Sequence, residues 1–417
     1  MTRKLKLQTE NWKLKTVQQI PVPKTLDVEV VERQLAELWQ ETAGDSDEDV
    51  AVLRARVANL LVFVSRESLL EEVGALMPDV TGVHPSRALV MLGERDVADQ
   101  DIEMYVTSLC QTDKRTGAKR LCGEVVVLKA RGKFIGELPS ATLPLLVSDL
   151  TTFLWWRNEL QVSDKIFSAL LRASDRLVID SDEFANPLQD LLEINGLFSQ
   201  AKYKHAGVSD LNWARLTLWR GLLADFYDVP AYQPLLNEID YVRIDYVSPA
   251  VERETVAPQA LLMAGWLTRC LGWSFMGDQA KQDNDQTLAF EFSRLPSDKS
   301  LTESAGSGKQ TIKLELNRVE RGEHKPGRLV EVELRASGRQ PASFSVRRSA
   351  DNLHVLAEAN IGADIQRGRV LPVRNRSLAH LLSREMEILI NDNLYQQSLA
   401  LATALIDLSS SSEADQS

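Results

Sequence analysis

Arginines placed beside tryptophans form the most chemically suggestive pattern in the sequence, in the run DLNWARLTLWRGLLADFYD (residues 210–228). At about 100° per residue, the large apolar side chains of this run form a helical arc of roughly 180°, and Arg215 projects inside that arc. A lone buried guanidinium is costly, so Arg215 must pair with a carboxylate, hold an anion or lie at a protein interface, and the carboxylate pair is the favoured alternative. Trp213 and Arg220 lie at the edge of the arc, where a partner protein could contact them, and both residue types are enriched at interface hot spots.

Polar and aromatic residues also follow three runs that read as buried parallel strands. They are Ser65–Arg66, Trp155–Trp156–Arg157 and Asp180–Ser181. Ligands of open α/β sheets bind beyond the carboxyl ends of such strands, so these residues could cradle an anion such as a sugar phosphate near Trp156 and Arg157. The favoured alternative is structural, with Ser65 capping a helix, the tryptophans packing in the core and the arginines solvated.

Two of the three cysteines lie on the two strands of an expected hairpin. If its turn is centred at Thr116, Cys110 and Cys122 face each other directly. Opposed residues of an antiparallel pair have Cα atoms about 4.5 or 5.5 Å apart, which a disulfide tolerates. The two residues are therefore a candidate redox pair, although cytoplasmic thiols are normally reduced. Cys270 is expected to be a core residue.

Signatures of common enzyme classes lack key residues. The run AGSGKQT (residues 305–311) fails as a phosphate-binding loop because Glu303 and Gln310 replace the required Gly and Ser or Thr, and we expect a linker. The turn VSRES after the first buried strand has no glycine that would let backbone approach a dinucleotide. No histidine or cysteine pair has metal-ligand spacing, and no G-x-S-x-G nucleophile elbow occurs. We therefore expect a protein that is not an enzyme and that has no cofactor and no metal.

The elements that would position these residues form an α/β fold in two domains. Residues 1–57 are expected to be an N-terminal extension with a helix over 28–39. Residues 58–230 alternate strands and helices, which predicts a mixed, partly parallel sheet with flanking helices, Rossmann-like but without the dinucleotide fingerprint. A single helix is expected over 210–227 and belongs to this domain.

The second expected domain is α+β and spans residues 231–408. After a strand near 237–248 and an apolar helix over 257–273, short strand-like runs separated by turns predict an antiparallel sheet. An amphipathic segment over 377–408 ends the domain. Residues 409–417 are expected to be a disordered tail.

Composition narrows the possible partners. The 417 residues carry a net charge of −11, which argues against general affinity for nucleic acids or anionic membranes. No run approaches the roughly 20 apolar residues that a membrane span needs, and three cysteines do not make a secreted disulfide framework. We expect a cytoplasmic protein.

Five motifs in order resemble the glucose-6-phosphate dehydrogenase assembly protein OpcA family. They are HPSRALVML, GEVVVLKARG, LPLLVSDLTTFLWWRNEL, DRLVIDS and DLNWARLTLWRGLLADFYD. The resemblance covers about residues 60 to 400. It implies a non-catalytic protein that binds glucose-6-phosphate dehydrogenase, promotes its active oligomer and acts as an allosteric activator, controlling the oxidative pentose phosphate pathway.

Two expectations qualify this resemblance. In photosynthetic bacteria the family is linked to thioredoxin control, but the C-terminal segment from Ser383 to Leu408 contains no cysteine. Thioredoxin therefore remains a candidate partner only through other cysteines. The alternative function is a sugar-phosphate-binding enzyme or sensor that uses the strand-end site near Trp156 and Arg157.

Overall fold

The computed structural model divides into two compact units. The described residues are 18–20, 28–44, 53–54, 56–112, 119–249, 255–276, 281–284, 286–294, 311–320, 322–338, 340–362, 364–373, 377–388 and 392–414. The first unit comprises residues 1–179, 200–211 and 376–391, and the second comprises 180–199, 212–375 and 392–417. These ranges differ from the expected division at residue 230, because the chain enters and leaves each unit more than once.

The first unit is built around sheet A, which confirms the expected mixed, partly parallel sheet. Its strands are β1 (Gln18–Ile20), β2 (Leu53–Arg54), β3 (Ala58–Val64), β4 (Ser86–Glu94), β5 (Gln100–Thr112), β6 (Lys119–Arg131), β7 (Thr152–Arg157), β8 (Arg176–Ile179) and β9 (Gly207–Asp210). The α-helices are α1 (Val28–Gly44), α2 (Glu67–Val83), α3 (Leu138–Thr142), α4 (Lys165–Arg172) and α10 (Leu378–Met386).

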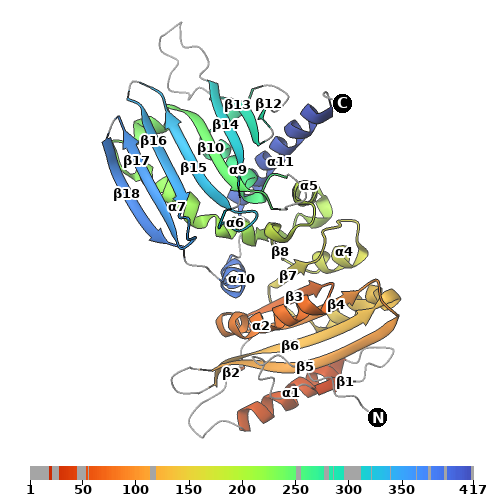
Figure 1. The fold of residues 1–417 in the computed structure, drawn as a ribbon. Coiled ribbons are helices and arrows are strands. Elements are labelled where there is room, and N and C mark those ends of the chain that lie inside the picture. The colour runs from red at the N-terminus through yellow and green to blue at the C-terminus, as the bar shows by residue number, and fades with distance from the viewer. Residues whose placement is uncertain are drawn as a thin grey trace. The chain divides into compact units, whose positions relative to one another are not determined.

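The strand order of sheet A is β1-β5-β6-β4-β3-β7-β8-β9, with β2 beside β6 (Figure 1). Six consecutive strands of this order, β6, β4, β3, β7, β8 and β9, pair with their neighbours in parallel. Strand β5 pairs with β6, and β1 pairs with β5, in antiparallel orientation. Every residue of β3, β7 and β8 is buried, as expected for parallel strands covered on both faces. Strand β4 lies on one side of β3, and β7, which comes later in the sequence, lies on the other side. The direction in which strands are added to the sheet therefore reverses between β3 and β7.

The second unit is built around sheet B. Its strands are β10 (Ile239–Val247), β11 (Trp273–Phe275), β12 (Lys281–Asn284), β13 (Thr287–Arg294), β14 (Thr311–Val319), β15 (Leu329–Ala336), β16 (Ala342–Arg348), β17 (His354–Ile361) and β18 (Asp364–Pro372). The helices are α5 (Pro187–Ser199), α7 (Thr217–Asp225), α8 (Gln233–Leu236), α9 (Pro258–Cys270) and α11 (Asn393–Ala414), together with α6 (Leu211–Arg215), whose first residue belongs to the first unit.

Sheet B follows the order β11-β13-β14-β10-β15-β16-β17-β18, with β12 beside β13 (Figure 1). All of its pairs are antiparallel except β10 with β14, so the expected antiparallel sheet is in fact mixed. The parallel pair arises because α9 and three strands intervene between β10 and β14, and such a long connection can return the chain in the same direction.

Alternating burial gives sheet B one apolar face and one polar face. In β14, Ile312, Leu314 and Leu316 are buried, whereas the residues between them are partly exposed. Helix α9 packs beside α11, and a Cβ atom at Gly265 of α9 would lie 2.1 Å from the carbonyl oxygen of Ser398 in α11. Glycine is therefore required where these two helix backbones meet.

Several local expectations are corrected by the structure. Residues 207–210 form strand β9, where no strand was expected, and Asp210 ends this strand instead of beginning a helix. The helix expected over 210–227 is interrupted at Leu216, whose amide donates to the carbonyl of Trp213 at 3.0 Å, three residues back. Helix α11 extends to Ala414, so residues 409–414 are helical and not a disordered tail. The expected linker at 305–310 lies outside the described residues, and Thr311 begins β14.

Candidate functional site

The turn after β3 occupies the position where a Rossmann fold binds the phosphates of a dinucleotide. Strand β3 ends at Val64, α2 begins at Glu67, and Ser65–Arg66 fill the turn. Glu67 places a carboxylate in the first turn of α2 and accepts a hydrogen bond from Lys129 Nζ at 2.6 Å. This acidic helix start disfavours an anion, because negative charge already occupies the positive end of the helix dipole.

Arg157, at the end of β7, is directed at a carboxylate of α2. Its Nη1 lies 3.2 Å from Glu72 Oε1, and its Nη2 donates to Glu72 Oε2 at 3.3 Å. The guanidinium also lies 5.1 Å from the ring centroid of Trp155. The Arg157 side chain is 2% exposed and that of Glu72 is 47% exposed, so the pair joins a buried arginine to a carboxylate at the surface. This ion pair favours a structural role for Arg157 over the anion cradle, but the arginine is buried and not solvated as expected.

Trp156 is packed into the core of the first unit. Its ring stacks on Phe63 with centroids 4.5 Å apart and meets the edge of Phe167 at 5.0 Å. The indole Nε1 donates to the carbonyl of Glu159 at 3.2 Å. These three contacts satisfy the Trp156 side chain internally, which agrees with the packing alternative for the tryptophans.

Arg215 pairs with Asp180 inside the second unit. Its two terminal nitrogens donate to the two carboxylate oxygens at 2.6 and 2.7 Å. Asp180 follows β8 and also accepts a hydrogen bond from the amide of Asp182 at 3.2 Å. The exposed fractions of the Arg215 and Asp180 side chains are 22% and 4%. The charge inside the apolar arc is thus neutralised by a bidentate pair, which is the strongest form of this interaction.

Trp213 and Arg220 form one stacked pair beside this ion pair. The Arg220 guanidinium lies 3.4 Å from the ring centroid of Trp213. Trp213 Nε1 donates to Asp392 at 3.0 Å, and its ring contacts Tyr395 at 5.7 Å. Trp213 is only 3% exposed, so the expectation that a partner reaches it directly is corrected. Arg220 is partly exposed and remains a candidate contact residue.

The hairpin of β5 and β6 has the expected register, with Cys110 directly opposite Cys122. Their side chains lie outside the described part of the structure, so the redox pairing stays a prediction. Cys270, expected in the core, is exposed at the end of α9. Burial of its thiol nevertheless raises its pKa, while the charges of Arg269 and Arg220 act in the opposite direction.

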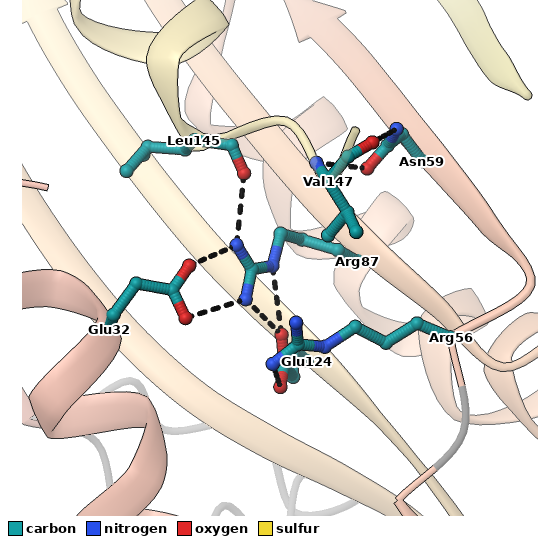
Figure 2. A network of polar contacts seen from close by, with 7 residues as sticks. All are labelled: Glu32, Arg56, Asn59, Arg87, Glu124, Leu145 and Val147. Atoms are coloured by element: carbon teal, nitrogen blue, oxygen red, sulfur yellow. Dashed lines mark hydrogen bonds and ion pairs between the residues drawn. The ribbon is translucent and has the colours of Figure 1, made fainter. Parts of the chain in front are cut away.

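A buried ionic cluster in the first unit was not identified from the sequence (Figure 2). Arg87 of β4 donates from Nε to Glu124 of β6 at 2.8 Å and also pairs with Glu32 of α1. Arg56 donates to the second oxygen of Glu124 at 2.7 Å. Burial alone would raise the pKa of Glu124, but the charges of Arg87 and Arg56 outweigh that effect and lower it.

The same cluster ties a loop to the amino ends of the parallel strands. Arg87 donates to the carbonyl of Leu145 at 3.0 Å. Nearby, the side chain of Asn59 at the start of β3 donates to the carbonyl of Val147 at 2.9 Å and accepts from its amide at 3.0 Å (Figure 2). A charged residue in an otherwise buried strand was the available sequence signal for this cluster. Its geometry indicates a structural role, because its partners satisfy one another.

The described residues also bear on metal binding and on membrane spanning. Within the described ranges, no group of three or more His, Cys, Asp and Glu residues is arranged to hold a metal ion. Among the helices of those ranges, none combines the length and apolar character that crossing a bilayer requires.

Comparison with protein families gives two adjoining matches. Residues 78–196 match the model of the glucose-6-phosphate dehydrogenase subunit N-terminal domain, and residues 206–399 match that of the C-terminal domain. The matched ranges together span most of the chain. Along the chain, the match to the N-terminal domain model precedes the match to the C-terminal domain model.

Curated relatives with the name OpcA occur in cyanobacteria, and their names link them to the OxPP cycle. The Synechocystis sp. relative is 26% identical over 314 residues, which is 75% of this chain and 62% of the relative. The Synechococcus elongatus relative is 27% identical over 338 residues, which is 80% of this chain and 71% of the relative. The chain thus spans less than two thirds of the length of the Synechocystis relative.

Solved structures with a partial likeness are oxidoreductases. An oxidoreductase from Sinorhizobium meliloti matches with a TM-score of 0.42 and 9% identity over 86% of this chain and 98% of that structure. An NAD-binding oxidoreductase from Klebsiella pneumoniae matches with a TM-score of 0.43 and 11% identity over the same shares. Nothing about activity follows from similarity this low. The two family models decide the relationship: the chain belongs to the OpcA family of glucose-6-phosphate dehydrogenase assembly proteins.

Proposed function

We propose that this protein binds glucose-6-phosphate dehydrogenase, promotes its active oligomer and acts as an allosteric activator without catalysing a reaction itself. The observation that carries the proposal is the ordered match of both subunit-domain models over residues 78–196 and 206–399. The names of the cyanobacterial relatives support a place in the oxidative pentose phosphate pathway. The proposed setting is the cytoplasm.

Two strand ends of sheet A, where an open α/β sheet would hold a small ligand, bear on the alternative function. The strand-end turn presents Ser65–Arg66 and the carboxylate of Glu67 where a nicotinamide dinucleotide would need glycine and a free helix start. At the next strand end, Arg157 is engaged by Glu72. These contacts give the alternative of a sugar-phosphate enzyme or sensor near Trp156 and Arg157 no specific support.

Arg220 is the candidate contact residue that fits the proposed partner best. It is partly exposed, and its guanidinium already packs on the ring of Trp213, 3.4 Å from the centroid, so less side-chain freedom is lost on binding. Arginine on an aromatic ring is also a frequent component of binding hot spots. Thioredoxin is proposed as a second partner only through Cys110 and Cys122.

A mixing experiment tests the function. The purified chain is added in increasing amounts to its cognate glucose-6-phosphate dehydrogenase, and reaction rates and particle mass are measured on the same samples. We expect no dehydrogenase activity from the chain alone, and a saturable rise in the activity of the dehydrogenase together with a larger complex. Excess protein that leaves the Michaelis constant, the turnover and the oligomer mass unchanged contradicts the proposal.

A further inference from the structure

Two arginines meet at one end of sheet B in the second unit. Arg328 immediately precedes β15, and its Nη2 donates to Asp182 at 2.7 Å. Arg348 is the last residue of β16, and its Nε donates to the carbonyl of Leu329 at 3.1 Å. Arg348 alternates with the buried Phe344 and Val346 of the same strand, so its side chain lies on the core face of sheet B.

Positive charge exceeds negative charge in this group. Asp180 neutralises Arg215, and Asp182 neutralises Arg328. Arg348, by contrast, makes no ion pair with any carboxylate in the described part of the chain. Its guanidinium faces the ring of Trp219, with 5.7 Å between the guanidinium carbon and the ring centroid.

The neighbouring Arg328 makes a positive charge on Arg348 less favourable. Burial, and then the charge of the neighbouring Arg328, lower the pKa of Arg348 to about 10. An internal structural arginine is normally accompanied by an acidic partner, as Arg87 and Arg157 are in the first unit. Here the only carboxylate partner among the described residues, Asp182, pairs with Arg328, and the Arg348 guanidinium keeps the bidentate fork with which arginines recognise phosphate groups.

One hydrogen-bond donor of the two arginines is also left without a partner within the described ranges. Arg328 Nη1 is buried and has no hydrogen-bond partner among the described residues. Buried polar groups are almost always paired, so this nitrogen requires a partner that the described chain does not supply. The Arg328 side chain as a whole is 20% exposed, so the buried Nη1 belongs to a residue that reaches the solvent.

We propose that Arg328 and Arg348 form a binding site for the phosphate group of a small ligand. The planar guanidinium forks match the oxygens of a phosphate, and the ligand charge offsets the excess positive charge of the pair. Asp182 holds one side of Arg328 and so leaves Nη1 for the ligand. Trp219 supplies an apolar wall on the side of Arg348.

The test uses the full chain by itself and therefore does not depend on the dehydrogenase. Inorganic phosphate and glycerol 3-phosphate are titrated at constant ionic strength, with chloride as the control, and the melting temperature and the heat of binding are recorded. We expect saturable binding and a rising melting temperature, because a ligand that binds the folded state stabilises it. Tighter binding of glycerol 3-phosphate identifies a phosphorylated ligand, and equal binding identifies free phosphate.

Matched variants on one strand locate the site. Arg348→Gln should weaken phosphate binding at least tenfold, whereas Arg347→Gln should bind like the parent, because Arg347 is 48% exposed on the opposite face of β16. Arg348→Met should melt at a higher temperature than the parent without phosphate, since it removes an unpaired charge, and should lose the response to phosphate. Arg328→Gln should also lose phosphate binding, but it leaves Asp182 without its arginine partner. If this variant fails to fold, the Arg348 variants decide whether the site lies here.

Two results overturn the proposal. One is a parent chain that responds to phosphate no more than to chloride. The other is an Arg348→Gln chain whose phosphate affinity equals that of the parent and of the Arg347→Gln control. This result would place any phosphate binding elsewhere.

Discussion

Arg215 and Asp180 form a bidentate ion pair, with both terminal nitrogens of the guanidinium donating to the carboxylate at 2.6 and 2.7 Å. The pair explains why an arginine occurs among the large apolar side chains of residues 210–228. It also joins α6 to the segment that follows β8 and so fixes two parts of the second unit that are 35 residues apart. The carboxylate partner inferred from the sequence is confirmed. A role of Arg215 in partner or anion binding remains a prediction.

Removing Arg215 should destabilise the second unit. In the Arg215→Ala variant, Asp180 would be left 4% exposed without its main charge partner, which costs about 3 kcal/mol for a buried pair. Chemical denaturation measures the loss. Asp180→Asn combined with Arg215→Ala should recover part of it, because no uncompensated charge remains. An Arg215→Ala chain as stable as the parent would mean that the pair is energetically neutral.

The buried cluster of the first unit should respond very differently to two carboxylate changes. Glu124→Gln should lower the free energy of unfolding by about 3 kcal/mol, because it leaves Arg87 buried with less compensating charge. Glu32→Gln should cost less than about 1 kcal/mol, since Glu32 is 40% exposed and Arg87 keeps Glu124. Equal losses in the two variants would show that burial does not control the strength of these contacts.

Lowering the pH should destabilise the first unit, because Glu124 becomes protonated. Its pKa is lowered in the folded state, so its contribution to stability is present above the unfolded pKa of about 4.5 and is lost as the pH falls through the folded value. The free energy of unfolding of the parent should therefore fall below about pH 4.5, whereas Glu124→Gln should show a shallower fall. Denaturation curves between pH 7 and pH 3 measure both slopes. Parallel curves would exclude Glu124 as a source of the acid sensitivity.

Much of the architecture followed from local patterns, because buried strands and amphipathic helices differ in period. The hairpin register followed from counting outward from its turn, which is why Cys110 and Cys122 were placed opposite each other. Strand β9 was missed because it has four residues and leads into a helix without a turn signal. The parallel pair of β10 and β14 was missed because strands far apart in sequence leave no local trace of their pairing.

The charged contacts were harder to predict than the strands. Arg215 could be identified from the sequence because a helix places neighbouring side chains at fixed angles, so a helical projection shows an arginine on an apolar face. Arg87 and Arg348 instead depend on partners that are remote in sequence, such as Glu124 of another strand for Arg87. The interruption at Leu216, which separates Trp213 in α6 from Arg220 in α7, was likewise invisible in an ideal helical projection.

The stacked arginine should separate binding from folding. Arg220→Ala should lower stability by no more than about 1 kcal/mol, the usual contribution of a partly exposed cation–π contact. We expect the same variant to bind glucose-6-phosphate dehydrogenase at least tenfold more weakly, measured by titration calorimetry. Arg269→Ala is the control, because Arg269 lies on the exposed end of α9 and makes no contact with Trp213 in the described structure. Unchanged binding by Arg220→Ala would remove Arg220 from the proposed interface.

Oxidation should crosslink Cys110 to Cys122. Their backbone positions are directly opposed in the β5–β6 hairpin, where Cα atoms lie about 4.5 or 5.5 Å apart and a disulfide can form. An oxidant such as hydrogen peroxide would accept two electrons and two protons from the thiols, and a reduced dithiol such as that of thioredoxin would return them. Peptide mass spectrometry after oxidation should find the crosslink, and Cys110→Ser should lose any redox effect on activation of the dehydrogenase. Cys270→Ser is the matched control and should respond like the parent, because Cys270 lies alone at the end of α9. If Cys110→Ser still responds to oxidant and thioredoxin as the parent does, this pair is not the switch.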